Sequence, residues 1–152
     1  MKRFWIVCLA VCSITAAGGC SQEKPPPTPE LSADGACIVK YKDEQYGCNI
    51  RFLSKDVETI TVNSPAAVKG MTFRSGNGKF SISYSSLICR SDSLLLPEDS
   101  FPKTAARAVH DFRSKSDTLE ANADTNGYTF SNHSYTLKTD PNGIIKEILL
   151  KQ

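Results

Sequence analysis

His110 and His133 are the two side chains best suited to acid–base chemistry at neutral pH. His110 falls on the polar side of a predicted helix, and His133 falls in a predicted turn. Neither has a nucleophile or carboxylate at the spacing of a known catalytic motif, and HExxH and GxSxG do not occur. Ser21 and Lys24 have the spacing of the SxxK motif. The match does not indicate a catalytic site, because these residues lie in a proline-rich stretch. We therefore expect no catalytic residue and no cofactor, and an enzyme is the least favoured class.

Three cysteines, Cys37, Cys48 and Cys89, follow Cys20 in the chain. They form no CxxC motif and no cluster with histidine, so we expect no metal site. Outside the cytoplasm a pair of them can oxidise. The register of a hairpin described below predicts a disulfide between Cys37 and Cys48. Two alternatives stay open, namely two buried thiols or a bond from Cys89 to one of the others.

The N-terminus has the three zones of a secretion signal. Lys2 and Arg3 form a basic end, Phe4–Ile14 is almost wholly apolar, and Thr15–Gly19 is a run of small residues. The apolar run is too short for a spanning helix, which needs ~20 residues. We predict a signal peptide over residues 1–19.

The segment Ala17-Gly18-Gly19-Cys20 resembles the bacterial lipobox. The resemblance implies that Cys20 carries a diacylglycerol anchor with fatty acids such as palmitate, and that cleavage makes it the first residue. It also implies an extracytoplasmic position on the cell membrane or outer membrane. The alternative is ordinary secretion with cleavage after a small residue. Residues 20–34 are rich in proline, which predicts an extended tether.

Charge is balanced once the signal is removed. Without Lys2 and Arg3, the 18 basic residues become 16, which equals the 16 acidic residues. The sequence shows no stripe of Lys and Arg that would neutralise phosphates, so nucleic acid is not an expected partner. Residues 35–152 have the length of a single domain.

Alternation of apolar and polar residues predicts a first hairpin from residues 36–42 and 45–53, with a turn near Lys42-Asp43. This register pairs Val39 with Tyr46 and Cys37 with Cys48. One face then collects the apolar and aromatic side chains, which are Cys37, Val39, Tyr41, Tyr46, Cys48, Ile50 and Phe52. The other face shows Lys40, Lys42, Asn49 and Arg51.

Asn77-Gly78 predicts a second hairpin, because a type I′ turn needs two residues with positive φ. This register pairs Phe73 with Ile82 and Met71 with Tyr84 on one face. The opposite face carries Thr72, Arg74, Ser81 and Ser83. Between the hairpins, Val57–Asn63 is a strand that could pair either way.

Residues 99–116 are predicted as an amphipathic helix, with Asp99 or Ser100 as its cap and Pro102 in its first turn. Its single apolar stripe consists of Phe101, Ala105, Ala108, Val109 and Phe112.

The C-terminal part returns to strands. We predict that Tyr128 pairs with Leu137 and Phe130 with Tyr135 across a turn at 131–134. Asp140-Pro141-Asn142-Gly143 is a turn by composition, and the strand Ile144–Leu150 follows it.

Together these elements predict an α+β fold, a curved antiparallel β-sheet (a meander or half-barrel) with one amphipathic helix packed on it. The stretches that run from Asn63-Ser64-Pro65 through Gly70-Met71-Thr72-Phe73 to Ser81-Ile82-Ser83-Tyr84, and the closing hairpin Tyr135–Leu150, resemble a group of uncharacterised clostridial lipoproteins. That group is similar in outline to the LolA/LolB-type half-barrel. The resemblance implies a curved sheet with helices in its concavity, and it carries over no functional residue.

All five tyrosines fall on the inferred core faces. A possible apolar pocket or core face therefore consists of Tyr41, Tyr46, Phe73, Ile82, Tyr84, Tyr128, Phe130 and Tyr135. We expect a non-enzymatic binding or interaction module whose partner is an unknown protein or apolar ligand. The alternative is a carrier that holds a lipid or other apolar ligand in a cavity between sheet and helix.

Overall fold

The computed structural model describes residues 34–54, 57–90, 96–114 and 118–151. The predicted signal peptide, Cys20 and the tether before Asp34 lie outside these residues. The elements of the described chain, in order, are β1 (Gly35–Tyr41), β2 (Glu44–Ser54), β3 (Val57–Ser64), a 3-10 turn η1 (Ala66–Val68), β4 (Thr72–Gly76), β5 (Lys79–Tyr84), β6 (Leu87–Arg90), α1 (Phe101–Ser114), β7 (Glu120–Asp124), β8 (Gly127–Ser131), β9 (Tyr135–Thr139) and β10 (Ile145–Leu150).

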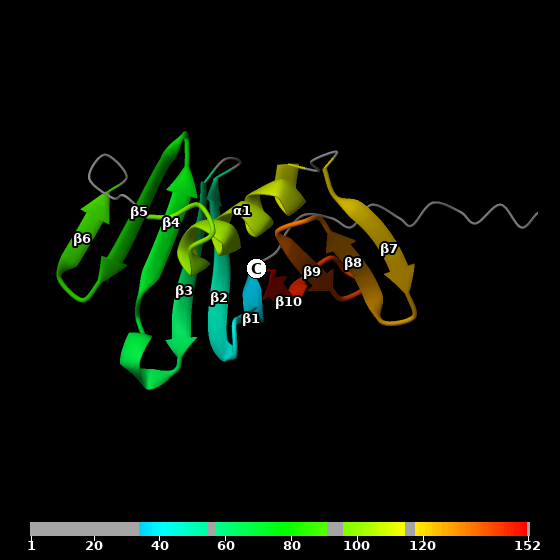
Figure 1. The fold of residues 1–152 in the computed structure, drawn as a ribbon, viewed down its shortest axis with the longest axis horizontal. Helices are drawn as coiled ribbons and strands as arrows, with labels where there is room; N and C mark the ends of the chain where they lie inside the picture. Colours follow the sequence, from blue (N-terminus) through cyan, green and yellow to red (C-terminus); the bar gives the residue numbers. More distant parts are fainter. Residues whose placement is uncertain (1–33, 55–56, 91–95, 115–117, 152) are drawn as a thin grey trace, which may run out of the picture.

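The ten strands form one open, curved sheet in the order β6-β5-β4-β3-β2-β1-β10-β9-β8-β7 (Figure 1). Neighbouring strands are antiparallel, except that β1 and β10 run parallel. Each half is a meander of local hairpins, and the parallel pair joins the halves. The predicted α+β class is confirmed, whereas the expectation of a wholly antiparallel sheet is wrong at this central pair.

The first hairpin has the predicted register. Val39 lies opposite Tyr46 and Cys37 lies opposite Cys48. The turn falls after Tyr41, and Lys42 has a φ of 57°. Because side chains alternate along a strand, this register sends the apolar set of the hairpin to one face of the sheet.

The second hairpin is also confirmed. Phe73 lies opposite Ile82, and Asn77 and Gly78 both have positive φ. Strand β3 lies between the two hairpins and is antiparallel to both β2 and β4. The sequence leaves open on which side the strand 57–63 pairs. The structure shows that it pairs on both sides.

The predicted register of β8 and β9 is wrong by two residues. The predicted turn covers residues 131–134, but β8 extends through Ser131 and the loop covers residues 132–134. The Asn132 side-chain oxygen accepts hydrogen bonds from the backbone N–H groups of Ser134 and Tyr135, which closes the loop nearer to β9 and moves the pairing along that strand. A shift of two keeps every side chain on its predicted face. The observed pairs are Tyr128 with Thr139 and Phe130 with Leu137.

Helix α1 lies across one face of the sheet (Figure 1), where it contacts β3 and β4 on one side and β9 and β10 on the other. Its bounds fall inside the predicted range 99–116, and Pro102 lies in its first turn. The Ser100 hydroxyl does not act as the predicted cap, since it is buried without a hydrogen-bond partner among the described residues. The Ser100 carbonyl accepts the N–H of Thr104 instead. The buried members of the predicted stripe are Ala105, Ala108, Val109 and Phe112.

The core lies between α1 and the sheet. Phe73 is 1% exposed, and its ring meets the ring of Phe101 edge-on at 5.4 Å. The ring of Tyr46 stacks on Phe101 at 4.3 Å. Phe130 meets Phe112 at the other end of the helix. The apolar face that the sequence predicts is therefore packed against the helix along its length.

Four of the five tyrosines join this core, and Tyr84 does not. Tyr135 is fully buried and donates its hydroxyl to Asp111 at 2.6 Å. Burial, and then this carboxylate, raise the pKa of Tyr135. Tyr84 is 39% exposed, and its hydroxyl donates to the carbonyl of Ala67. The expectation for Tyr84 is wrong because β5 lies near the end of the sheet, beyond the helix.

Replacing Phe73 by alanine should lower the free energy of unfolding by about 3–5 kcal/mol, because it removes buried area and leaves a void beneath Phe101. The exposed Leu87 provides a matched control, and its replacement by alanine should cost less than about 0.5 kcal/mol. Urea melts followed by circular dichroism measure both. A loss in Phe73→Ala close to that of the control would contradict a packed core.

Candidate ligand-binding face

The described chain has a hollow of about 1160 Å³ on the face of the sheet opposite α1. It extends from the start of β1 across β2, β3, β4 and β5 to β6. The apolar side chains of these strands point to the helix, so alternation sends their polar partners to the hollow. The turn residues Asn77 and Lys79 lie at its rim.

Strand register places five of the lining residues in one row across five strands. Arg51 lies opposite Thr59, and Thr59 lies opposite Arg74. Arg74 lies opposite Ser81, and Ser81 lies opposite Arg90. We call this set the arginine row. Guanidinium groups and hydroxyl groups thus alternate from β2 to β6.

A second row runs beside the first and carries amide and hydroxyl groups in place of cations. Asn49 lies opposite Thr61, Thr61 opposite Thr72, and Thr72 opposite Ser83. Ile88 ends this row on β6. The hydroxyl oxygens of Thr61 and Thr72 are 3.2 Å apart and share a hydrogen bond. We call this set the hydroxyl row.

The hollow is positively charged. Its cationic residues are Arg51, Arg74, Lys79 and Arg90, and Asp34 is the one acidic residue among its described lining. One oxygen of Asp34 accepts the backbone N–H of Phe52 at 2.8 Å. An anion in the hollow would therefore meet several cations and little opposing charge.

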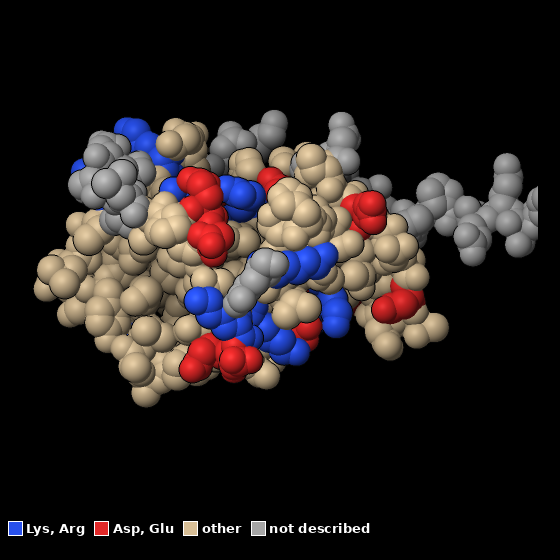
Figure 2. Space-filling model, viewed as in Figure 1, with Lys and Arg blue, Asp and Glu red and all other residues tan. Residues whose placement is uncertain are grey.

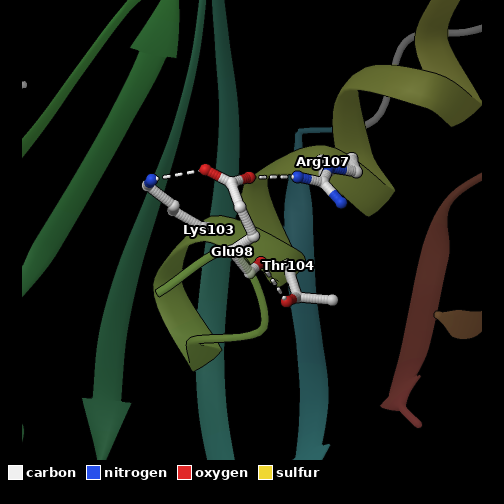
Figure 3. Close-up of polar contacts among 4 residues, drawn as sticks. All are labelled: Glu98, Lys103, Thr104 and Arg107. Carbon is white, nitrogen blue, oxygen red and sulfur yellow. Dashed lines mark hydrogen bonds and ion pairs between the residues drawn. The ribbon is translucent and has the colours of Figure 1, made fainter. Parts of the chain in front are cut away.

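The α1 side of the molecule has a different charge pattern, with basic and acidic side chains interspersed (Figure 2). Just before the helix, Glu98 forms ion pairs with Lys103 at 2.7 Å and with Arg107 (Figure 3). These two cations lower the pKa of Glu98. The cations of α1 thus have acidic neighbours, whereas Asp34 is the one acidic residue in the described lining of the hollow.

The residue types of the two rows determine their chemistry. A guanidinium donates paired hydrogen bonds to a carboxylate or phosphate. A serine or threonine hydroxyl both donates and accepts. The Thr59 hydroxyl is buried and has no hydrogen-bond partner among the described residues. The described lining includes no histidine, cysteine or glutamate. These groups can hold an anion and hydrogen-bond its neighbours.

The predicted site residues lie on the other side of the sheet. Phe73 and Tyr135 are fully buried beneath α1, and Phe130 and Ile82 pack against the same core. The face predicted as pocket or core is therefore core. The large hollow that the structure does show is lined mainly by polar residues of the same hairpins, with apolar residues such as Leu53, Val57 and Ile88 among them.

Within the described chain, His110 is the one histidine that lies near a carboxylate. The order of its group, Ser75, Glu58 and His110, is not that of a catalytic triad. The Nδ1 of His110 is 3.6 Å from Glu58, which is 1% exposed. Burial raises the pKa of Glu58, while Ser75, His110 and Arg113 oppose this rise. Glu58, and not the histidine, is the central member, so the group lacks a histidine that could take a proton from Ser75.

Cys37 and Cys48 lie directly opposite each other, as predicted, and the structure holds them as free thiols. Burial, and then proximity to Cys48, raise the pKa of Cys37 to about 12. Burial raises the pKa of Cys48 to about 12 as well. Cys89 is exposed on β6. The disulfide between Cys37 and Cys48 stays a prediction.

Sequence reasoning missed the arginine row. Arg51 and Arg74 were each placed correctly on the polar face of a hairpin, but the two hairpins were not placed side by side. The expectation that no stripe of Lys and Arg neutralises phosphates stays a prediction, because the row carries an arginine only on every second strand. The sequence feature that could have revealed the row is Thr59. When β3 pairs on both sides, Thr59 lies between Arg51 and Arg74.

Comparisons with known proteins add no family to this description. No family model, no curated protein and no solved structure matches the chain. Within the residues that the structure describes, no helix is long and apolar enough to cross a membrane.

Alkylation of the native protein should modify Cys89 first, because Cys37 and Cys48 are buried and a thiol with a pKa of about 12 is almost wholly protonated at pH 8. Peptide mass spectrometry after iodoacetamide treatment measures each site. After unfolding, Cys37 and Cys48 should react at once if they are thiols, and only after reduction if they form the disulfide. Fast native modification of Cys48, or a peptide linking Cys89 to either residue, would contradict this account.

Proposed function

We propose that this protein is an extracytoplasmic, lipid-anchored binding module that holds an anionic ligand on the face of its sheet opposite α1. The observation that carries the proposal is the arginine row, three guanidinium groups on alternating strands within one hollow. Export and lipidation at Cys20 rest on the N-terminal sequence pattern. Binding rather than catalysis fits the side chains that line the hollow.

The end of the predicted tether supports a link between anchor and site. Asp34, the last residue of that tether, lines the hollow together with Gly35. The residues that would tether the domain to a lipid therefore join it at the rim of the hollow. A ligand held there would lie on the tethered side of the domain.

The carrier alternative is less well supported, because the aromatic residues that would line a cavity between sheet and helix are packed against α1. An interaction module without a small ligand is supported by a different observation. The end strand β6 exposes Leu87 (68%) and Ile88 (64%), as an edge that pairs with a partner strand would. The charge of the hollow favours the anion-binding reading.

Replacing both Arg51 and Arg74 by glutamine should weaken binding of citrate, the probe anion, by at least tenfold. Each charge-assisted hydrogen bond contributes about 1.5–3 kcal/mol, and about 1.4 kcal/mol is a factor of ten. Amide chemical shifts in Thr59, Thr72 and Ser81 should move on titration in the wild type. Lys138→Gln is the matched control, because Lys138 lies on another part of the same sheet and bonds Glu147. Equal citrate affinity in all three proteins would contradict the proposal.

The anchor has a separate test. In a bacterial host, intact-mass analysis of the wild type should show added acyl mass on a chain that begins at Cys20. Cys20→Ser should give an unlipidated chain with its signal uncleaved or miscleaved, because lipobox processing depends on the thiol. A wild-type protein without acyl mass would refute lipidation and leave the binding face unaffected.

A further inference from the structure

We infer that the ligand of the arginine row is a linear acidic polysaccharide with one carboxylate per disaccharide, lying across strands β2 to β6. This inference rests on the proposed function of the hollow and specifies its ligand. The first observation is spacing. Neighbouring strands are ~4.8 Å apart, so guanidinium groups on alternating strands are attached about 10 Å apart. That distance is close to the length of a disaccharide.

The second observation is what lies between the arginines. Thr59 and Ser81 occupy the intervening positions of the row. A chain that alternates acidic and neutral sugars would place a carboxylate over each arginine and a neutral sugar over each hydroxyl. The hydroxyl row lies two residues further along the strands, about 7 Å away. It offers Asn49, Thr61 and Thr72 to the sugar hydroxyls on one side of the chain.

The third observation is the low density of positive charge. A nucleic acid strand carries a phosphate every ~3.4 Å, so a row with one cation per ~10 Å would leave most phosphates unpaired. Neither row contains an aromatic side chain, whereas single-stranded nucleic acids are held by stacking on aromatic rings. A sparsely charged polymer with many hydroxyl groups matches the face better.

The fourth observation is that the row ends at the edge of the sheet. β6 is the end strand, and Arg90 and Ile88, its contributions to the two rows, are both exposed. Among the described strands, none pairs with the outer edge of β6. A polymer can therefore continue past this strand, and the three arginines set the length that it occupies at about three disaccharides.

Hyaluronan oligosaccharides of defined length are the probe, measured by isothermal titration with the domain that begins after Cys20. Affinity should rise at least tenfold from the disaccharide to the hexasaccharide and change by less than threefold beyond it. Arg51→Gln, Arg74→Gln and Arg90→Gln should each lower hexasaccharide affinity about tenfold. Lys138→Gln, the matched control, should leave it unchanged. Neutral chitin oligosaccharides of the same length should bind at least a hundredfold more weakly.

Three outcomes would overturn the inference. Equal affinity for the disaccharide and hexasaccharide, with binding still lost in Arg74→Gln, would leave an anion site but refute the polymer. Tighter binding of single-stranded RNA than of hyaluronan would replace the polysaccharide by a nucleic acid. Absence of binding by hyaluronan and by citrate alike would refute the proposed function together with this inference.

Discussion

The parallel pairing of β1 with β10 is the contact on which the rest of the fold depends. Each half of the sheet is held by antiparallel pairs between strands that follow each other in the chain, and such pairs can form locally. Among the described strand pairs, only β1–β10 joins residues more than one hundred positions apart, as in Ile38 beside Glu147. Helix α1 depends on this pair, because its stripe contacts strands from both halves and needs one continuous surface beneath it.

Helix α1 gives the two faces of the sheet different surroundings. The face beneath α1 gains stability by burying Phe73, Leu137 and Ile148 away from water. The opposite face carries mainly polar side chains, and on β2 to β6 these line the hollow. Because the side-chain period of a strand is two, the register that buries Phe73 also exposes Arg74. Stability of the core and composition of the proposed binding face are thus coupled through one register.

Local chemistry made much of the fold predictable. The positive φ of Asn77 and Gly78 determines the second hairpin within a few residues, and the spacing of Ala105, Val109 and Phe112 determines the helix. The predicted register of β8 and β9 was wrong because the side chain of Asn132 sets where the turn falls, which alternation does not encode. The end strands β6 and β7 escaped prediction because all their residues are exposed and show no alternation in burial.

The sequence by itself determined which face of each hairpin each residue occupies, since alternation and turn type act over a few neighbouring positions. It therefore placed Arg51 and Arg74 away from the core. Only the tertiary structure decided that these residues lie in one row, because that requires β3 to pair on both sides and align Thr59 between them. Pairing between distant strands depends on the shared core under α1, and no local pattern carries that information.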